Sequence, residues 1–517
     1  MTLTSFNLKQ FINYLRYGFS PLGGRGLKAF IFLFLLFCNN IVFSQTKDFK
    51  LGLSDVIALA QSDAPNVLLA KTRLATDYWS YQSFLADFKP QVDLNLTPID
   101  LKRSPVPFLT PTGRSVFLRQ TAMNSSFDVS LSQSIPKTGG RIFAGTGLQY
   151  YFNFETDANP SSSDFFSTPI YVGFQQPLFG FNEMKWNKKI EPLRYNQATK
   201  EYVEEMEAIA MRTTELFFDV YIAQINVRTS EINKANADTL YNVAQGRYSV
   251  GRIAETDLLQ IELSVRNAEA ALARALLENQ TSTEQLRNYL GIKEVVSFDL
   301  TPPDELPTFV VNATLALEQA KKNRSKSIEL QRRLMEADMN VAQAKSNSGL
   351  NASITGLIGL SQTAETLGGA YNKPLDREEV AVRLNIPIAD WGKAKSRMKI
   401  AEVTKEFTVM DVEQDRINFE REVLLHVQQF DMVKDQVNLA YRAYEISEKR
   451  EDITRKRYLI GKIEVIDLNL AIREKNEALA AYMVTLRAYW TSYYRLRSLT
   501  LYDFENGKSL VRETDFE

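Results

Sequence analysis

The 517-residue sequence contains a single cysteine, Cys38, and a single histidine, His426. One cysteine cannot form a disulfide within the chain, and typical zinc sites need several His and Cys ligands. The sequence also lacks a nucleophile elbow, a phosphate loop and a dinucleotide-binding motif. Nothing singles out a pair of catalytic carboxylates either. We therefore expect no bound metal, no cofactor and no enzyme activity.

An excess of basic charge is missing as well. The whole chain has 61 Lys and Arg against 62 Asp and Glu, a net charge of −1. Residues 1–44 hold four basic side chains and no acidic one, so the remainder has 57 against 62, or −5. Nucleic-acid-binding domains usually present a basic surface. We expect no nucleic-acid partner.

A long hydrophobic run is found only near the N-terminus, from Ala29 to Phe37. Four basic residues precede it and Val42-Phe43-Ser44 follows, an order typical of a secretion signal. We predict that residues 1–44 are a signal peptide. The bulky Phe37 before Cys38 argues against a lipoprotein. No later run is long enough for a membrane-spanning helix, so any membrane segment must consist of strands.

Alternating apolar and polar residues predict several strands. The clearest is Gln91–Thr97, where Val92, Leu94 and Leu96 alternate with Asp93 and Asn95. Polar connections at 99–125 and 155–168 are expected to be exposed loops. The other alternating segments are 127–132, 142–154, 170–177, 350–361 and 379–388.

Helical periodicity predicts two very long helices, 183–249 and 392–458, each roughly 100 Å long. Gly251 and Gly461 mark the turns into return helices that end near residues 290 and 499. Shorter helices are expected at 54–88 and 313–345, with a linker at 298–312. The long helices carry heptad seams. These are Val203, Met206, Ala210, Thr213, Phe217, Val220 and Gln224, and Phe419, Val423, His426, Phe430, Val433, Val437, Ala440 and Tyr444.

The chain repeats itself. Arg247-Tyr-Ser-Val-Gly-Arg-Ile-Ala-Glu-Thr-Asp-Leu-Leu259 matches Arg457-Tyr-Leu-Ile-Gly-Lys-Ile-Glu-Val-Ile-Asp-Leu-Asn469, 210 residues later. Pro177 and Pro387 have the same spacing. We predict a first repeat at 45–300, a second at 301–500 and a polar C-terminal tail at 501–517.

Together these features predict a membrane β-barrel on a helical shaft. Strands with one apolar face cannot rest in lipid as open sheets, because their edge groups would be unsatisfied. Each chain has too few strands for a wide pore, so several chains must contribute. Alternation alone also fits a soluble sandwich, and heptad seams alone also fit a stalk. The polar faces expected to line water carry Asp93, Asn95, Asp128, Ser130, Arg383 and Asn385.

The doubled phrase, the order of the elements and Gln176-Pro-Leu-Phe179 resemble the TolC family of outer-membrane efflux proteins. The resemblance covers about Leu51 to Leu499. It implies a fold that is mainly α with membrane β-barrel strands, built from two repeats as a homotrimer in the outer membrane of a Gram-negative bacterium. It further implies contact with outer-membrane lipid, a periplasmic helical barrel, a periplasmic adaptor and an inner-membrane pump. The function implied is the exit duct of a tripartite efflux pump or type I secretion system, for small molecules or polypeptides.

In such a duct the repeated phrase forms the periplasmic tip of each helical hairpin, where an adaptor docks. Glycine suits the reversal there because it readily adopts a positive φ. A plain helix–helix turn would explain the glycine equally well. The residues implied in the tips and in docking are Arg247, Val250, Gly251, Ile253, Arg457, Ile460, Gly461 and Ile463.

The resemblance also implies a gate at these tips, formed by Thr256, Asp257, Tyr458 and Asp467. Three copies of Asp467 would give an acidic ring that favours cations. Acids in a first helical turn are also favoured by the helix dipole alone, so a structural role stays open for both aspartates. Ile463 and Leu470 depart from the family pattern, which has a gate-locking Arg and a second acidic ring at those positions. How the tip closes is therefore open.

Two further alternatives remain at this level. A periplasmic adaptor or coiled-coil scaffold would also contain helical hairpins, although an adaptor needs a lipoyl-like domain and not amphipathic strands. The segment 126–154 exceeds a four-strand contribution per chain, and it either enlarges the barrel or extends a hairpin beyond it. The exported substrate is not encoded in any motif.

Overall fold

The computed structural model describes residues 48–109, 112–155, 160–294, 297–303, 306–307, 309–460 and 462–511. The predicted signal peptide and Gly461 lie outside these ranges. The chain divides into two units, of which the smaller, Met1–Phe49 with Glu294–Asp299, is described only in part. Strands β1 (Asp48–Gly52) and β6 (Ser297–Thr301) form a two-stranded sheet. All further description concerns the larger unit.

The first repeat contains the predicted long helix, α5 (Glu183–Ser249), and its return helix, α6 (Glu255–Leu290). The helix predicted at 54–88 is instead two helices, α3 (Leu53–Asp63) and α4 (Pro65–Ala86). Ala64 between them is extended, with φ −62° and ψ 147°. A proline disfavours the helical conformation of the residue before it, which explains the break.

The second repeat has the same organisation, with α9 (Lys393–Leu459) and α10 (Val465–Thr500) as its long and return helices. The helix predicted at 313–345 is also two helices, α7 (Ala313–Asn323) and α8 (Ser325–Asn347). Here the break falls at Arg324. The Glu204 carboxylate on α5 accepts the Ser325 N–H at 2.7 Å and thereby caps α8.

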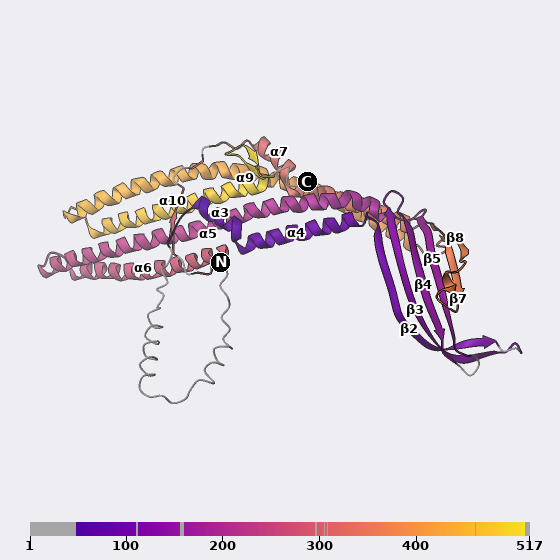
Figure 1. Cartoon of the computed structure of the whole chain (residues 1–517). Coiled ribbons are helices and arrows are strands. Elements are labelled where there is room, and N and C mark those ends of the chain that lie inside the picture. The colour runs from indigo at the N-terminus through magenta and orange to yellow at the C-terminus, as the bar shows by residue number, and fades with distance from the viewer. Residues whose placement is uncertain are drawn as a thin grey trace, which may run out of the picture. The chain divides into compact units, whose positions relative to one another are not determined.

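The helices pack as four neighbouring columns. Helices α3, α4 and α6 lie along α5, while α7, α8 and α10 lie along α9 (Figure 1). Helix α5 also contacts α8 and α10, which joins the two repeats. The column order is therefore α4/α6, α5, α8/α10, α9. The predicted seams are confirmed at their centres, where these residues are buried: Ala210, Thr213, Phe217, Val220, Phe419, Val423, Phe430 and Val437.

One six-stranded antiparallel sheet contains the predicted amphipathic strands. Its order is β2-β3-β4-β5-β7-β8. The register places Val92, Leu131, Ala144, Val172 and Ile358 in one row, so one face of the sheet is apolar. The strands are β2 (Gln91–Leu109), β3 (Ser115–Ile135), β4 (Gly140–Asn153), β5 (Ser162–Pro177), β7 (Asn351–Ala364) and β8 (Leu375–Asn385).

The loop predicted at 99–125 is wrong, because most of it belongs to β2 and β3. These strands pair as far as Leu109 with Ser115, past a bulge between Thr97 and Asp100. Prolines and basic residues concealed the alternation there. The loop predicted at 155–168 is shorter than expected, since β5 begins at Ser162.

The C-terminal residues form a short hairpin that packs against the helices. Strands β9 (Tyr502–Asp503) and β10 (Lys508–Ser509) form a small hairpin after α10. Arg497 lies 3.2 Å from Asp503 and makes a bidentate ion pair with the buried Glu207 of α5. The predicted C-terminal tail thus contains a short hairpin that is tied to α10 and α5, and 512–517 lie outside the described ranges.

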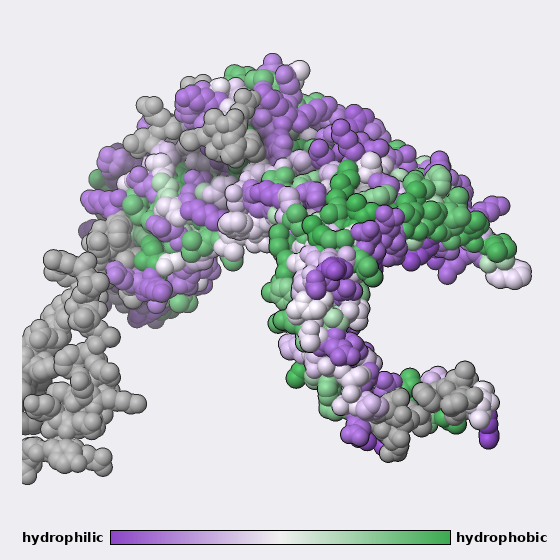
Figure 2. Space-filling model, turned by 45° about the vertical axis from the view of Figure 1, so that its right-hand side comes forward, coloured by the Kyte–Doolittle hydropathy of each residue, from purple (hydrophilic) through white to green (hydrophobic). Residues whose placement is uncertain are grey.

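Large hydrophobic side chains also reach the surface of this unit. Phe407 and Met410 of α9 are 67% and 71% exposed, and Val380 of β8 is 79% exposed. In the view of Figure 2, hydrophobic patches lie at the surface among hydrophilic ones. None of the helices in the described ranges is long and apolar enough to cross a membrane.

Candidate functional site

The first hairpin tip reverses the chain within a few residues after α5. Gly251 has φ +72°, and the Arg252 N–H donates to the Arg247 carbonyl at 2.9 Å. This is the 6→1 bond of a helix ending with a left-handed residue. A Cβ added at Gly251 would meet nothing within 4 Å, so the backbone angle alone favours glycine there.

The second tip repeats this geometry. The Lys462 N–H donates to the Arg457 carbonyl at 3.0 Å, the same bond as at the first tip. Gly461, at the equivalent position to Gly251, lies outside the described residues. The shared bond supports the predicted equivalence of the two phrases.

A hydrophobic cluster joins the two hairpins just above the tips. Tyr458 of α9 is 4% exposed and packs with residues of α5, α6 and α10. The Arg247 guanidinium lies over its ring, 5.6 Å from the centroid. Among the described residues Tyr458 is therefore held by packing and this cation–π contact. The cluster consists of Leu240, Ala244, Ile261, Tyr458 and Leu468.

The apolar residues predicted for docking fall into two pairs. Val250 and Ile460 are 66% and 65% exposed, at the outermost points of the turns. Ile253 and Ile463 are only partly exposed and pack against the tip cluster. Of the four apolar residues, only Val250 and Ile460 are therefore free to form an exposed docking surface. Ile253 and Ile463 each precede a return helix closely enough for the side chain to fold back onto the core.

The predicted gate residues other than Tyr458 lie at the surface of the tips. Thr256, Asp257 and Asp467 are exposed, as is Arg457, while Arg247 is half-buried. The Asp257 carboxylate accepts the Ala254 N–H at 3.3 Å, which satisfies one free donor at the start of α6. Asp257 thus has a capping role within its own chain. The Asp467 carboxylate lies in the first turn of α10.

A buried carboxylate above the second tip did not emerge from the sequence. Glu451 of α9 is 2% exposed and lies 2.6 Å from Arg455 Nη2 and 3.7 Å from Lys475 Nζ on α10. Arg450 and Glu474 form a second ion pair between the same helices. The i, i+4 spacing of Glu451 and Arg455 was the available signal. Its burial depends on α10 and was not readable.

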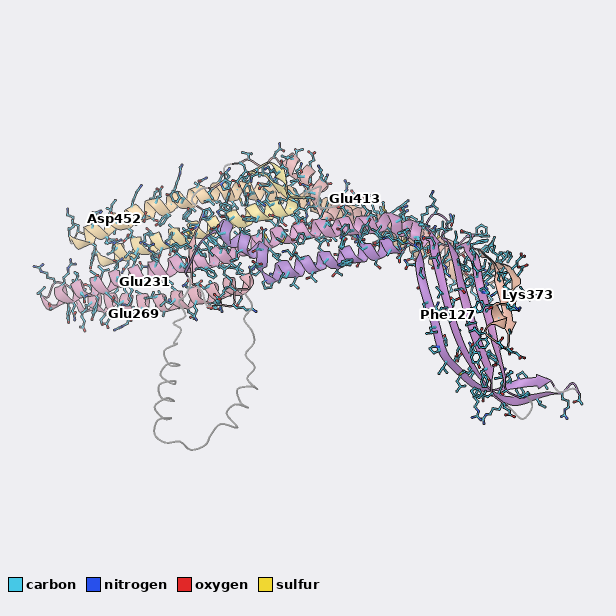
Figure 3. The ribbon with its side chains drawn as sticks, viewed as in Figure 1. Phe127, Glu231, Glu269, Lys373, Glu413 and Asp452 are labelled. Atoms are coloured by element: carbon cyan, nitrogen blue, oxygen red, sulfur yellow. The ribbon has the colours of Figure 1, made fainter. Side chains whose placement is uncertain are left out.

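Toward the tips, charged side chains share the exposed surface of the hairpins with apolar ones such as Ile453. Figure 3 labels Glu231, Glu269 and Asp452 in this part of the helices, far along them from Phe127 on the sheet. Asp452 pairs with Lys456 at 2.6 Å and Glu269 with Arg266 at 3.1 Å. These exposed pairs within one helix contribute little stability and serve mainly as a hydrophilic surface.

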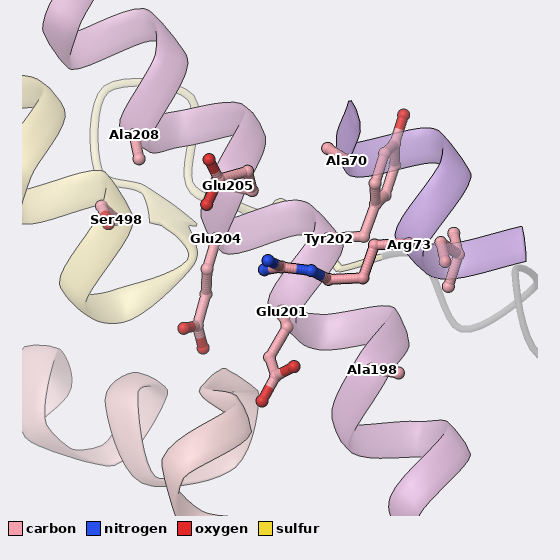
Figure 4. A pocket seen from close by; sticks show the side chains of 10 residues that line it. Ala70, Arg73, Ala198, Glu201, Tyr202, Glu204, Glu205, Ala208 and Ser498 are labelled. Carbon is pink, nitrogen blue, oxygen red and sulfur yellow. The ribbon is translucent and has the colours of Figure 1, made fainter. Parts of the chain in front are cut away.

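A pocket of about 260 Å³ lies where α4 meets α5, with Ser498 of α10 at its edge (Figure 4). Arg73 and three glutamates, Glu201, Glu204 and Glu205, line it. Glu204 already binds Arg324 and caps α8, so the pocket is part of a structural joint. Within the described ranges, no group of three or more His, Cys, Asp or Glu is arranged to hold a metal ion.

His426 is packed within the helical wall. Its Nε2 lies 3.1 Å from the Ser492 carbonyl of α10, and a carbonyl only accepts, so Nε2 carries the hydrogen. Burial lowers the pKa of His426 below its usual value. The side chain is therefore a neutral contact between α9 and α10.

Comparison with known protein families gives a match to the model described as outer membrane efflux protein, over residues 119–292 and 316–500. Among curated proteins, the outer membrane protein TolC of Vibrio cholerae is 25% identical over 343 residues. That alignment covers 62% of this chain and 74% of the relative. Both findings concern proteins of the outer membrane.

Solved structures with the same fold include the CmeC outer membrane channel of Campylobacter jejuni, with a TM-score of 0.63 and 15% identity over 90% of this chain and 87% of that one. The outer membrane protein VceC of Vibrio cholerae has a TM-score of 0.60 and 14% identity, covering 87% and 96%. The open-state MtrE outer membrane channel of Neisseria gonorrhoeae has a TM-score of 0.59 and 14% identity, covering 87% and 88%.

Proposed function

The chain belongs to the outer membrane efflux protein family, and we propose that three copies of it assemble into a closed duct that docks on a periplasmic adaptor and an inner-membrane pump. The protein is an outer-membrane efflux duct of a Gram-negative bacterium, with its helices in the periplasm. The adaptor or scaffold alternative is not favoured, because the similar proteins described above are channels. The proposal adds the assembly, its partners and the roles of the tips.

One observation carries the proposal. On each of its two sides the described part of the chain ends in a strand edge without hydrogen-bond partners and in a helix column with an exposed apolar stripe. Strands β2 and β8 are the unpaired edges of the sheet. Strand β2 follows α4 and β8 precedes α9, so each open edge continues from an outermost helix column. An open edge in lipid leaves peptide groups without hydrogen bonds, so it needs a partner strand.

The outermost helices carry exposed apolar stripes that need the same partner. On α9 the stripe recurs at steps of three, four, seven and eight residues, opposite the buried seam. Such contiguous apolar surface marks an interface. Its members are Val403, Phe407, Met410, Ile417, Leu424, Met432, Leu439, Ile446 and Ile453. On the other side the exposed residues are Leu68, Leu69 and Trp79 of α4 and Leu259, Leu263, Leu276 and Leu277 of α6.

A second copy fits both surfaces. Six antiparallel strands place β2 and β8 in opposite directions, so β8 of one copy runs antiparallel to β2 of the next. Head-to-tail contacts of this kind generate rings when the rotation closes. Three copies, the number implied by the family resemblance, then present six tips to the adaptor. Val250 and Ile460 are the exposed apolar residues of these tips.

The proposed gate lies within this ring of tips. Asp467 occurs three times in a trimer, and its exposed carboxylates form a ring that favours cations. Thr256 and Asp257 belong to the contacts that hold the closed tip together. Tyr458 and Arg247 hold the two hairpins of a chain together. No catalytic role is proposed for any residue.

The experiment combines fractionation with conductance. The mature protein is expected in the outer-membrane fraction as a trimer that dissociates on heating, and it should conduct ions in planar lipid bilayers. Co-purification of the adaptor and pump would identify the system. A water-soluble monomer with no conductance would contradict the proposal.

A further inference from the structure

Four of the six strands in the sheet connect directly to one of the four helix columns. Helix α4 leads into β2, β5 leads into α5, α8 leads into β7, and β8 leads into α9. The columns and these four strands occur in the same spatial order. Strands β3 and β4 have no helix of their own. They lie between β2 and β5, above the contact of α4 with α5.

Strands β3 and β4 are full members of the sheet. Their register runs without interruption from Ala122 paired with Asn153 to Ile135 paired with Gly140. β3 also pairs with β2, and β4 with β5. Every strand position between the two open edges is therefore occupied. Only the outer ends of β2 and β3, from Arg103 paired with Thr121 to Leu109 paired with Ser115, continue beyond β4 as a two-stranded hairpin.

A side-chain tie crosses these strands on the polar face. Tyr171 of β5 reaches across Gly145 of β4 and donates to the Asp128 carboxylate of β3 at 3.1 Å. A Cβ at Gly145 would lie 2.5 Å from the Tyr171 hydroxyl, so glycine is what lets the ring pass. This contact locks β3 and β4 to the strand that enters α5.

The apolar face also continues through the two added strands. Leu131 of β3 and Ile142 of β4 are 45% and 47% exposed. They face the same side as Val92 of β2, Phe174 of β5 and Val380 of β8. A contiguous apolar face of this kind marks a surface that contacts lipid or another protein. The inserted strands thus carry the surface of a membrane wall.

The widths of the two parts of the wall agree only when all six strands are counted. Strands about 4.8 Å apart and tilted by about 40° cover roughly 38 Å of circumference for six, and roughly 25 Å for four. Four helix columns at about 8–10 Å spacing cover roughly 32–40 Å. The six-stranded sheet is as wide as the helical wall that carries it.

We propose that the assembled protein closes an 18-stranded barrel, in which β8 of each copy pairs with β2 of the next. This rests on the trimer proposed above. Such a barrel has a backbone diameter of about 36 Å, against about 24 Å for 12 strands, and leaves an aqueous channel. The exit through the outer membrane is then as wide as the helical shaft.

Disulfide trapping tests which strand of the next copy β8 meets. Cys38 is the sole cysteine of the sequence, so engineered pairs report without background from residues 45–517. Leu96→Cys on β2 is combined with Val380→Cys, Val382→Cys or Leu384→Cys on β8. The matched control replaces Leu96→Cys by Leu148→Cys on β4. Leu148 lies two strands away in the same row, through Phe127.

At least one Leu96 pair should form a covalent trimer on mild oxidation, and the Leu148 pairs should not. In the proposed barrel β4 lies three strand spacings, about 14 Å, from β8 of the neighbouring copy, which exceeds the reach of a disulfide. Trimers that are trapped through Leu148 would mean that β2 and β3 leave the wall and that the barrel is narrower, which overturns the inference. The inference would also be overturned if the protein forms trimers but none of the three Leu96→Cys pairs cross-links them. Absence of any trimer before oxidation would instead contradict the proposed function.

Discussion

At the scale of single residues, Tyr458 is the centre of the contact between the two hairpins. Replacing it by alanine leaves a cavity in the tip cluster, a change that costs about 3–5 kcal/mol for a buried aromatic ring. We expect Tyr458→Ala to increase amide hydrogen exchange at the ends of α5 and α9. Tyr458→Phe keeps the ring and should behave like the parent. Equal exchange in the alanine variant would contradict the contact.

Variants of the two tip aspartates distinguish a gating role of these carboxylates from a helix-capping role. Asp257→Asn and Asp467→Asn keep an acceptor oxygen but remove the charge. If the carboxylates form rings in the pore, the preference of the channel for cations over anions falls in planar bilayers. If they act on the helix dipole alone, stability falls by about 0.3–1 kcal/mol and selectivity is unchanged. Unchanged selectivity in both variants would refute the gate.

His426 gives the helical wall a dependence on pH. Its folded pKa is lowered by burial, with Arg495 lowering it further and Glu422 raising it. Below a pH of about 6.5, His426 is therefore protonated in the unfolded chain but not in the folded chain. The free energy of unfolding consequently falls as the pH falls. Each unit of difference in pKa is worth about 1.4 kcal/mol.

We expect the thermal midpoint of the purified protein to drop between pH 7.5 and pH 5.5. His426→Gln keeps a donor for the Ser492 carbonyl and should reduce that drop. Aspartate and glutamate titration remains in both proteins, so the difference between them isolates the histidine. Identical drops would show that His426 does not titrate in this range.

Sequence reasoning at this scale found the tip residues but not their environments. The doubled phrase predicted both turns, and the same hydrogen bond closes each of them. It could not show that Ile253 and Ile463 fold back onto the cluster, because that depends on helices 200 residues away. The ion pair of Glu207 was missed for the same reason, since Arg497 follows 290 residues later. The pairing of Glu451 with Arg455 is local, and only its burial against α10 was not readable.

At the scale of elements, the turn between α5 and α6 depends on one backbone angle. Gly251→Ala places a side chain at φ +72°, which costs about 1–2 kcal/mol. Gly246→Ala is the matched control: this glycine lies inside α5 with open space around it, and alanine there should stabilise by about 0.5–1 kcal/mol. Thermal midpoints should move in opposite directions. A lower thermal midpoint in both variants would show that the φ angle of Gly251 is not the cause of the destabilisation.

The lengths of the elements were predictable where the period was clean. Both long helices were predicted to within about one residue, because the end of the strand alternation marks where each begins and Gly251 and Gly461 mark where each ends. The break at Ala64 was readable from Pro65 and was overlooked. The break at Arg324 was not readable, since the carboxylate that caps α8 comes from Glu204. The strand pairing of residues 99–125 was hidden because prolines and basic residues interrupt the alternation of apolar and polar residues there.

At the scale of the whole molecule, assembly depends on the apolar stripe of α9. Phe407→Glu places a charge where we propose that the next copy packs, and burying an unpaired charge is strongly unfavourable. We expect the trimer to be lost, or to dissociate at a clearly lower temperature, in detergent. Glu406→Gln beside it changes an exposed charge and should leave the trimer intact. A stable trimer of the Phe407→Glu variant would place the interface elsewhere.

The hairpin formed by β3 and β4 lies far along the chain from the helical tips and carries no helix. It lies between β2 and β5 in the sheet and is connected to both strands directly along the chain. The aperture at the cell surface can therefore change by whole hairpins while the machinery that docks at the other end stays as it is. In the proposed barrel, gain or removal of this one segment would change the width of the outlet and leave the docking tips as they are.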